Sequence, residues 1–171
     1  THHPSSAASD VYKRQQQRRS SYYSYYTMNR IILISGGFDP IHGGHVKYIR
    51  EAKKVDPPSP LCVALNSDEW LVRKKGKYFM NFDERKEVVS GMKDVDLVIP
   101  FIDDDGSACD AIDMCLQIYD LVIFCNGGDR NDVNAPEFDT FKTDHRVHFR
   151  WKVGGDDKHN SSSKILERWN S

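Results

Sequence analysis

The feature that most constrains the fold is a buried-strand pattern, followed by a glycine-rich turn and then by a helical pattern. The apolar run at residues 31–34 leads into Gly-Gly-Phe-Asp-Pro-Ile-His-Gly-Gly-His at residues 36–45, and a helix-patterned run occupies residues 46–54. Backbone N–H groups at a helix start lack internal partners and carry partial positive charge. This order of elements therefore predicts an anion site, with Gly36 and Gly37 letting the backbone approach a ligand.

Two histidines stand at the predicted helix start. His42 and His45 are three residues apart, so their side chains lie on one face of the helix. Gly44 places no side chain between them, which leaves room for a phosphate. Two other interpretations stay open at this point. The pair is also compatible with one surface and one core histidine, or with a metal pair, although no acidic or cysteine partner stands at a helpful offset.

Strand and helix patterns alternate along the rest of the chain. Continuous apolar runs are typical of strands that are covered on both faces. The alternation predicts one α/β domain over residues 28–171, with a doubly wound, mainly parallel, five-stranded sheet of Rossmann-like type. Strands are predicted at residues 30–35, 61–65, 96–101, 121–125 and 146–153. Helices are predicted at residues 45–55, 69–74, 82–92, 107–119, from 136, and 161–169.

The predicted topology also indicates where a ligand binds. In doubly wound sheets, ligands bind beyond the carboxyl ends of the strands, where the strand order reverses. We therefore expect four segments to share one edge of the sheet. They are the turn at residues 36–45, Asn66-Ser67-Asp68 with the basic loop at 74–77, residues 126–130, and residues 154–163.

The first 27 residues differ in composition from the rest. They hold five of the eight tyrosines and no leucine or isoleucine, which predicts a disordered tail. Residues 5–15 resemble a translated transposase sequencing adapter, so we expect a cloning-derived tail and a natural start at Met28, rather than a basic arm that binds nucleic acid. Without the tail's four basic residues and one acidic residue, 20 basic and 24 acidic residues remain, a net charge of −4. This balance argues against a general nucleic-acid binder, while permitting a local basic pocket.

The cysteines and the lengths of the apolar runs indicate in which cellular compartment the protein is expected. The four cysteines form no C-x-x-C pair, and Cys62 and Cys125 lie in apolar strand patterns. This predicts buried thiols in a reducing compartment rather than disulfides or a zinc site. We find no apolar run of bilayer length and no signal-like segment, so a cytoplasmic location without a membrane partner is expected. The Asp103-Asp104-Asp105 run is explained by a turn, and we expect no metal held by the protein there.

The turn carries a family resemblance. Residues 36–45 resemble the G-x-F-D-x-x-H-x-G-H motif of the cytidylyltransferase-like nucleotidyltransferases. Within that family, residues 28–169 most resemble the branch that holds heptose-1-phosphate adenylyltransferase and glycerol-3-phosphate cytidylyltransferase. Because several motifs follow in the branch's order and spacing, the resemblance is more specific than any one motif. They are Leu65-Asn66-Ser67-Asp68, Asp83-Glu84-Arg85-Lys86, Gly127-Gly128-Asp129 and Ser161-Ser162-Ser163-Lys164-Ile165.

The resemblance implies a Mg²⁺-dependent reaction between ATP or CTP and a small phosphorylated sugar or polyol, with release of pyrophosphate. The implied catalytic residues are His42, His45, Lys75 and Arg85. The implied nucleotide-binding residues are Gly36, Gly37, Phe38, Asp39, Gly44, Gly128, Asp129, Ser161, Ser162 and Ser163. The implied acceptor-binding residues are Asn66, Asp68 and Arg130. Asp39 is expected to orient His42 or to hold Mg²⁺ through water. Many members of this branch are homodimers.

Simpler interpretations accompany several of these roles. Each lysine is also compatible with a solvated surface charge, and Arg85 with an ion-pair partner on an exposed helix face. The serine run is compatible with an ordinary helix cap.

Departures from the family pattern bear on the substrate. Asp156 and His159 stand where the cytidylyltransferases carry an arginine and a glycine. The heptose adenylyltransferases also lack that arginine, so an ADP-heptose synthase-like reaction with ATP is favoured. Arg130 stands where relatives often carry an aromatic residue. The alternatives are a glycerol-3-phosphate-type cytidylyltransferase, a nucleotide-binding module without catalysis, and a fragment of a class I tRNA synthetase, whose lysine loop residues 161–164 match poorly.

Overall fold

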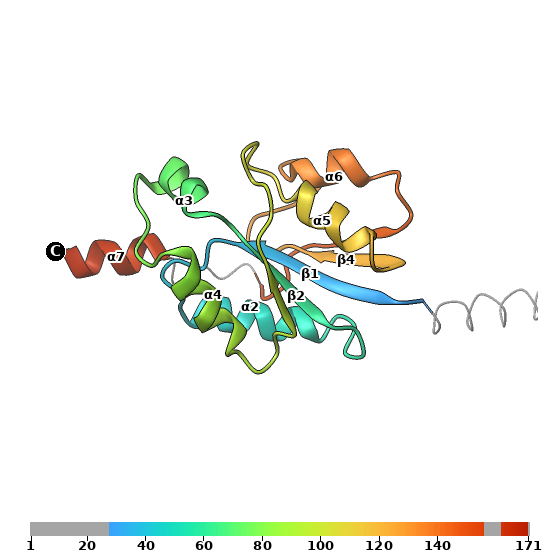
Figure 1. Ribbon diagram of the computed structural model, residues 1–171, viewed down its shortest axis with the longest axis horizontal. Coiled ribbons are helices and arrows are strands. Elements are labelled where there is room, and N and C mark those ends of the chain that lie inside the picture. Colours follow the sequence, from blue (N-terminus) through green and yellow to red (C-terminus); the bar gives the residue numbers. More distant parts are fainter. Residues whose placement is uncertain (1–27, 156–161, 171) are drawn as a thin grey trace, which may run out of the picture.

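A computed structural model describes residues 28–155 and 162–170. The predicted tail at 1–27, Asp156, His159 and Ser161 lie outside the described residues. Strands and helices alternate as predicted (Figure 1). The elements are β1 (Arg30–Gly36), α2 (Gly43–Lys53), β2 (Leu61–Leu65), α3 (Asp68–Lys75), α4 (Phe82–Ser90), β3 (Leu97–Ile99), α5 (Cys109–Leu116), β4 (Leu121–Cys125), α6 (Pro136–Phe141), β5 (Val147–Arg150) and α7 (Ser162–Asn170).

The five strands form one parallel sheet in the order β3-β2-β1-β4-β5. Ile32 of β1 lies opposite Leu61 of β2 on one side and opposite Ile123 of β4 on the other. The chain winds outward from β1 to β3 and then returns to β4 beside β1. The strand order therefore reverses between β1 and β4, which confirms the predicted doubly wound sheet.

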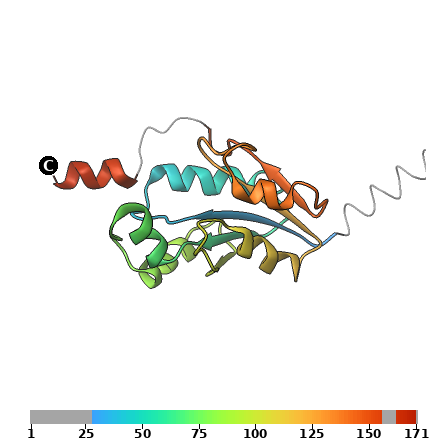
Figure 2. The same cartoon turned by 90° about the horizontal axis from the view of Figure 1, so that it is seen from above.

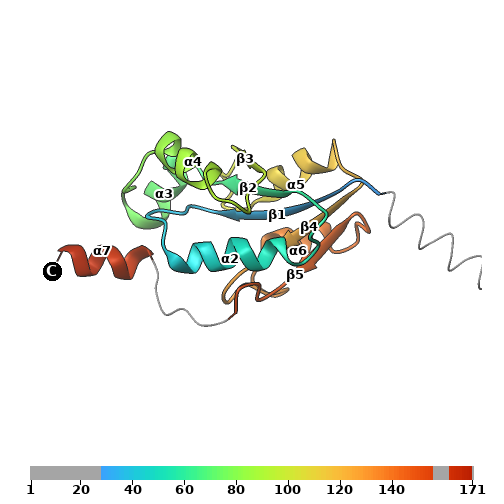
Figure 3. The ribbon, with the colours of Figure 1, turned by 90° about the horizontal axis from the view of Figure 1, so that it is seen from below.

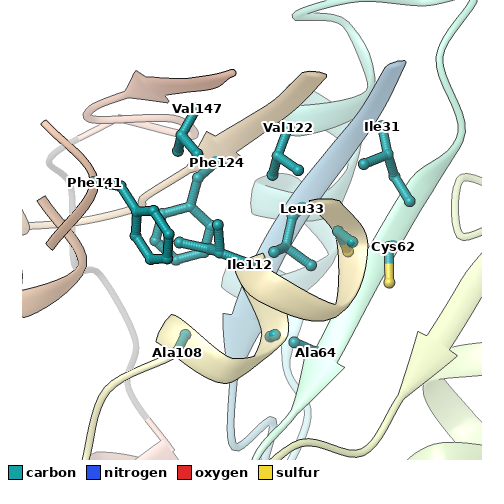
Figure 4. Close-up of a cluster of buried hydrophobic side chains, with 12 residues drawn as sticks. Ile31, Leu33, Cys62, Ala64, Ala108, Ile112, Val122, Phe124, Phe141 and Val147 are labelled. Carbon is teal, nitrogen blue, oxygen red and sulfur yellow. The ribbon is translucent and has the colours of Figure 1, made fainter. Parts of the chain in front are cut away.

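Helices cover both faces of the sheet, which explains the unbroken apolar runs of β1, β2 and β4. On one face, Ile112 of α5 and Phe141 of α6 pack with Leu33 and Phe124 (Figure 4). The other face is covered by α2 and α4, whose apolar residues pack against a second core cluster. In Figures 2 and 3, α7 projects away from the edge of the sheet where β1 ends.

Tyr48 fastens α2 to two loops at the carboxyl edge of the sheet. Its hydroxyl donates to the carbonyl of Cys125 at 2.5 Å, and burial raises the pKa of Tyr48. A Cβ atom at Gly127 would lie 3.1 Å from the Tyr48 ring, and one at Gly154 would lie 3.2 Å from the Tyr48 Cα. Gly154 also has a φ of 88°, which favours glycine. These glycines let the loops after β4 and β5 close onto the helix that carries the histidines.

The edge strands are shorter than predicted. β3 ends before Pro100, which has no N–H to donate to the ladder. β5 ends before a turn in which Lys152 and Gly154 have positive φ angles of 59° and 88°. Both edge strands end where the backbone can no longer continue the sheet.

Two predicted helix starts are corrected. α2 begins at Gly43 rather than at residue 45, with His42 in the cap position. Ser107 was predicted to cap α5, but Ala108 occupies the cap position. The Ser107 hydroxyl donates to the Asp105 carboxylate at 3.0 Å and accepts the N–H of Cys109, the first residue of α5, at 3.3 Å. Ser107 therefore still satisfies one N–H of the helix start from one position further back.

The predicted burial is confirmed for Cys62 and Cys125, and Cys115 is buried as well, whereas Cys109 is only partly buried. In the described part of the chain, no helix combines the length and the apolar character needed to cross a membrane.

Candidate active site

A cavity of about 440 Å³ opens at the carboxyl edge of the sheet, where the strand order reverses between β1 and β4. The four segments predicted to share this edge all contribute to its wall. The described lining residues are Ser35, Gly36, Gly37, His42, Gly44, His45, Lys47, Tyr48, Asn66, Trp70, Lys74, Lys75, Asn126, Gly127, Gly128, Arg130, Val153, Gly154, Gly155, Ser162 and Ser163.

The cavity wall is electropositive. Lys47, Lys74, Lys75 and Arg130 line it, while the described lining residues include no aspartate or glutamate. The N-terminus of α2 adds partial positive charge from its backbone N–H groups. A polyanion such as a triphosphate therefore suits this cavity better than a cation does.

The two histidines are held at the start of α2 by hydrogen bonds from the backbone. The Gly44 N–H donates to Nδ1 of His42 at 3.0 Å, and the His42 N–H donates to Nδ1 of His45 at 3.3 Å. The ring centroids lie 3.9 Å apart with an angle of 32° between the ring planes. Phe38 packs against the His45 ring at a centroid distance of 4.9 Å. Both rings are thus fixed in orientation before any ligand binds.

These hydrogen bonds select one tautomer. Because Nδ1 accepts a backbone N–H in both rings, a neutral ring carries its proton on Nε2. His42 and His45 therefore offer Nε2–H donors, which suit a phosphate oxygen. A metal pair through Nδ1 is excluded by the same bonds, and the described residues hold no group of three or more metal-ligating side chains.

Burial and neighbouring positive charge keep both imidazoles neutral. Burial lowers the pKa of His45 to about 3, helped by the proximity of His42 and of Lys75. The pKa of His42 is also lowered, by burial and then by the Lys75 charge. At neutral pH, both rings are therefore hydrogen-bond donors without a net charge.

Lys75 is the last residue of α3, and its side chain reaches the turn at residues 36–45. Its Nζ donates to the backbone carbonyl of Asp39 at 2.7 Å. Burial lowers the pKa of Lys75, against the opposing pull of the Asp39 carboxylate. Lys74, one residue earlier, lies over the Trp70 ring with its Nζ 4.3 Å from the ring centroid. Lys74 and Lys75 belong to α3, which extends to Lys75, and not to the basic loop predicted at residues 74–77. The end of this helix thus brings two differently anchored lysines to the cavity.

Arg85 does not have the predicted position at the substrate. It is 0% exposed and is not among the lining residues. Its guanidinium donates to the carbonyls of Gly37 and Asn66 at 2.8 and 2.9 Å, and to Asp68 at 2.6 Å. A further bond runs from Nε to the carbonyl of Met80. Arg85 therefore ties the glycine turn to the end of β2 and to the loop before α4.

The roles predicted for Asp39 and Asp68 are also corrected. Asp39 is 1% exposed, and its two carboxylate oxygens accept the N–H groups of Phe79 and Met80, each at 2.8 Å. It is engaged with the loop before α4 and makes no hydrogen bond to His42 in the described part of the chain. Asp68 pairs with Arg85 and does not line the cavity. Both carboxylates therefore bind other parts of the protein chain and do not line the cavity.

The other predicted residues divide by position. Gly36, Gly37, Gly44, Gly128, Ser162 and Ser163 line the cavity, as do Asn66 and Arg130. Phe38 and Asp129 do not line it, and Phe38 lies beneath the turn with a φ of 49°. Ser162 at the start of α7 donates to the carbonyl of Pro40 at 2.9 Å, which brings the serine run to the histidine turn. The binding roles of these residues stay predictions.

Sequence reasoning missed Asn126, Trp70 and Lys47 as lining residues. Lys47 lies on α2, two residues beyond His45, so its position could have been read from the helical spacing. Asn126 directly follows β4 and lay inside a predicted segment, yet its residue type alone carries no chemical signal. Trp70 gave no signal, because a tryptophan in an amphipathic helix is usually a core residue.

Arg85 allows a test of its structural role. Arg85→Met leaves Asp68 and three backbone carbonyls without their donor, so we expect a loss of about 3–5 kcal/mol in the free energy of unfolding. Arg85→Lys recovers little of it, because an ammonium cannot reproduce the forked contacts of a guanidinium. Urea unfolding measures both, with the exposed Arg50→Met as the reference. An Arg85→Met protein that is as stable as the wild type but inactive would contradict the structural role of Arg85.

The lowered pKa of His45 predicts a pH dependence of stability. The unfolded chain protonates His45 near pH 6.5, whereas the folded chain resists protonation to about pH 3. The neutral ring therefore contributes stability that is present above pH 6.5 and is lost as the pH falls towards 3. His45→Gln should reduce this loss by up to about 1.4 kcal/mol per pH unit. Parallel curves for wild type and variant between pH 4 and 7, with His145→Gln as the exposed reference, would contradict it.

Comparisons with known proteins agree with this geometry. A family model described as cytidylyltransferase-like matches residues 33–168. The chain is similar to the bifunctional protein HldE of Haemophilus influenzae (strain ATCC 51907 / DSM 11121 / KW20 / Rd), with 36% identity over 77 residues. Its similarity to HldE of Shewanella denitrificans is 39% over 77 residues. Each match covers 44% of this chain and only 16% of the relative's length.

A solved structure shows the same fold. The lipopolysaccharide core biosynthesis protein from Thermoplasma volcanium GSS1 aligns with a TM-score of 0.55 and 22% identity, over 76% of this chain and 99% of that one. At this identity, the likeness concerns the fold alone. The family model, however, extends from within β1 into α7 and so includes every segment of the cavity. The chain therefore belongs to the cytidylyltransferase-like family of nucleotidyltransferases.

Proposed function

We propose that this protein transfers an adenylyl group from ATP to the phosphate of a small sugar or polyol and releases pyrophosphate. The observation that carries this proposal is the pair of neutral, backbone-oriented imidazoles at the N-terminus of α2, within a cavity lined by cations. Such a pair suits an α-phosphate, because it offers two fixed N–H donors at the N-terminus of a helix, where the helix dipole favours negative charge. Family membership supports the reaction class.

The reaction requires positioning more than covalent chemistry. An oxygen of the acceptor phosphate attacks the α-phosphorus in line, a new P–O bond forms, and the bond to the pyrophosphate oxygen breaks. The attacking phosphate oxygen is already deprotonated at neutral pH, so no general base is needed. His42 and His45 donate from Nε2 to the equatorial oxygens, where negative charge rises in the transition state.

Cations and serines would hold the leaving pyrophosphate. Lys75 lies close enough to the histidines to influence their pKa, so it is well placed to neutralise charge between the α- and β-phosphates. Ser162 and Ser163 bring hydroxyls and the N-terminus of α7 to the same cavity. The dipole of a helix N-terminus favours phosphate oxygens.

Mg²⁺ is proposed to enter as part of the nucleotide complex. This ion usually binds one or two carboxylates together with substrate phosphates. The described lining residues offer no carboxylate, and Asp39 uses both its oxygens on backbone N–H groups. We therefore propose that Mg²⁺ is held mainly by the triphosphate oxygens rather than by carboxylates of the described cavity wall. Mg²⁺ bound to the triphosphate oxygens would reduce the charge that the cavity must offset.

ATP is favoured over CTP, and a heptose phosphate is favoured as acceptor. The motif near α7 lacks the arginine of the cytidylyltransferases, and the partial similarity to the HldE proteins points weakly in the same direction. A glycerol-3-phosphate-type cytidylyltransferase is the second candidate. A nucleotide-binding module without catalysis is disfavoured by the presence of both oriented histidines.

Pyrophosphate release tests the proposal. We expect release with ATP and heptose 1-phosphate to exceed that with CTP or with glycerol 3-phosphate. His45→Ala should lower kcat by about 100- to 1,000-fold, because it removes a donor to the transition state. Val46→Ala, at the exposed neighbouring position on α2, is the matched control and should retain activity. Unchanged turnover by a folded His45→Ala protein would refute the role of the pair, and release favouring CTP would select the second candidate.

A further inference from the structure

Asn126 is a buried polar side chain of the cavity that the proposed mechanism leaves unused. It is 7% exposed and lines the cavity, and its amide Nδ2 is buried without a hydrogen-bond partner among the described residues. Its backbone is fixed on both sides, because its N–H donates to the Arg150 carbonyl at 2.7 Å and its carbonyl accepts the Val153 N–H at 3.0 Å. Burying an unpaired amide costs stability, so its presence calls for an explanation.

The direction of this side chain follows from the strand pattern. Phe124 belongs to the core cluster beneath α5 and α6, while Cys125 belongs to the cluster beneath α2 and α4. The hydrogen bonds of Asn126 continue the ladder with β5, so its side chain lies on the same face as Phe124. By the same alternation, Asn66 lies on that face at the end of β2, two residues after Ala64.

The two halves of the cavity differ in charge. On the α2 side lie the histidines and the N-terminus of α2. On the α5 and α6 side, two buried carboxylates stand behind the wall: Asp103 accepts from Asn66 Nδ2 at 3.1 Å, and Glu137 lies 3.5 Å from Arg130. The negative charge of these two carboxylates disfavours a triphosphate in the half of the cavity near α5 and α6, so we place the triphosphate in the half near α2. The remaining half offers neutral carboxamides and one partly neutralised arginine.

We propose that the amide of Asn126 donates a hydrogen bond to a hydroxyl oxygen of the acceptor's sugar or polyol group, and so helps to select the acceptor. This inference rests on the proposed function and deepens it. A hydroxyl both donates and accepts, which matches a carboxamide, whereas a phosphate only accepts and is better matched by Arg130. In the free protein the Nδ2 atom is shielded from solvent, so the carboxamide turns about its Cβ–Cγ bond to bring Nδ2 to the acceptor hydroxyl, which then supplies the missing partner.

Two variants test the proposal. Asn126→Leu removes the amide, and Asn126→Asp keeps its shape but replaces the donor. We expect each to raise KM and the calorimetric Kd for heptose 1-phosphate by about 10-fold. Asn126→Leu introduces no charge, so in this variant the KM for ATP and the inhibition by inorganic phosphate, which carries no carbon-bound hydroxyl, should stay as in the wild type. Asn126→Leu should also melt no lower than the wild type without substrate, because it removes an unsatisfied buried group.

Several results would overturn the proposal. An unchanged acceptor KM and Kd in both variants would remove the contact. A rise in KM for ATP alone would assign the amide to the ribose, and equally weakened inhibition by phosphate would assign it to the phosphate. A lower melting temperature of both variants with unchanged kinetics would show a structural role. Calorimetry separates this inference from the proposed function, because the Kd ratio decides it even if the wild type binds heptose 1-phosphate without releasing pyrophosphate. Failure of the wild type to bind heptose 1-phosphate would refute the inference directly.

Discussion

The site depends on two backbone N–H groups that occupy Nδ1 of His42 and of His45 at the start of α2. These bonds fix the orientations of two rings that line the cavity and place the remaining proton of each ring on Nε2. They require the turn at residues 36–45 to hold its shape. The Arg85 guanidinium and the Asp39 carboxylate provide that support, because each bonds backbone groups from a different segment of the chain. The orientation of the two histidines therefore depends on hydrogen bonds that hold the turn in place.

Negative and positive side chains lie in different places around the cavity. The buried carboxylates Asp39, Asp103 and Glu137 accept hydrogen bonds from backbone or side-chain groups behind the cavity. The described cavity wall itself carries lysines, an arginine and two neutral imidazoles. Because the carboxylates are engaged elsewhere, the field at the wall is positive where a triphosphate would lie. Neutral imidazoles avoid the cost of burying two like charges 3.9 Å apart, while still donating hydrogen bonds.

Much of the fold could be predicted from the sequence. Continuous apolar runs indicate strands that are buried on both faces, and the alternation of strand and helix patterns indicates a doubly wound sheet. The order of the strands placed His42, Asn66 and Gly128 at one edge before any contact was known. The errors concern side chains whose partners are distant in sequence. Arg85 stands in a recognisable motif, yet its partner Gly37 is 48 residues away, so its motif did not reveal that its donors are already used. Asn126 was missed for the same reason, since its unpaired amide is visible only in the packed structure.

The most direct test of the account is the tautomer of the two histidines, observed by long-range ¹⁵N–¹H correlation spectroscopy of the ¹⁵N-labelled protein at pH 7. The account predicts that His42 and His45 are both neutral with the proton on Nε2, and that the Nε2–H signals of both shift when ATP and Mg²⁺ are added. Single His→Gln variants assign the signals. A proton on Nδ1, a charged imidazolium in the free protein, or signals that ATP leaves unchanged would contradict the claim that this pair binds the α-phosphate.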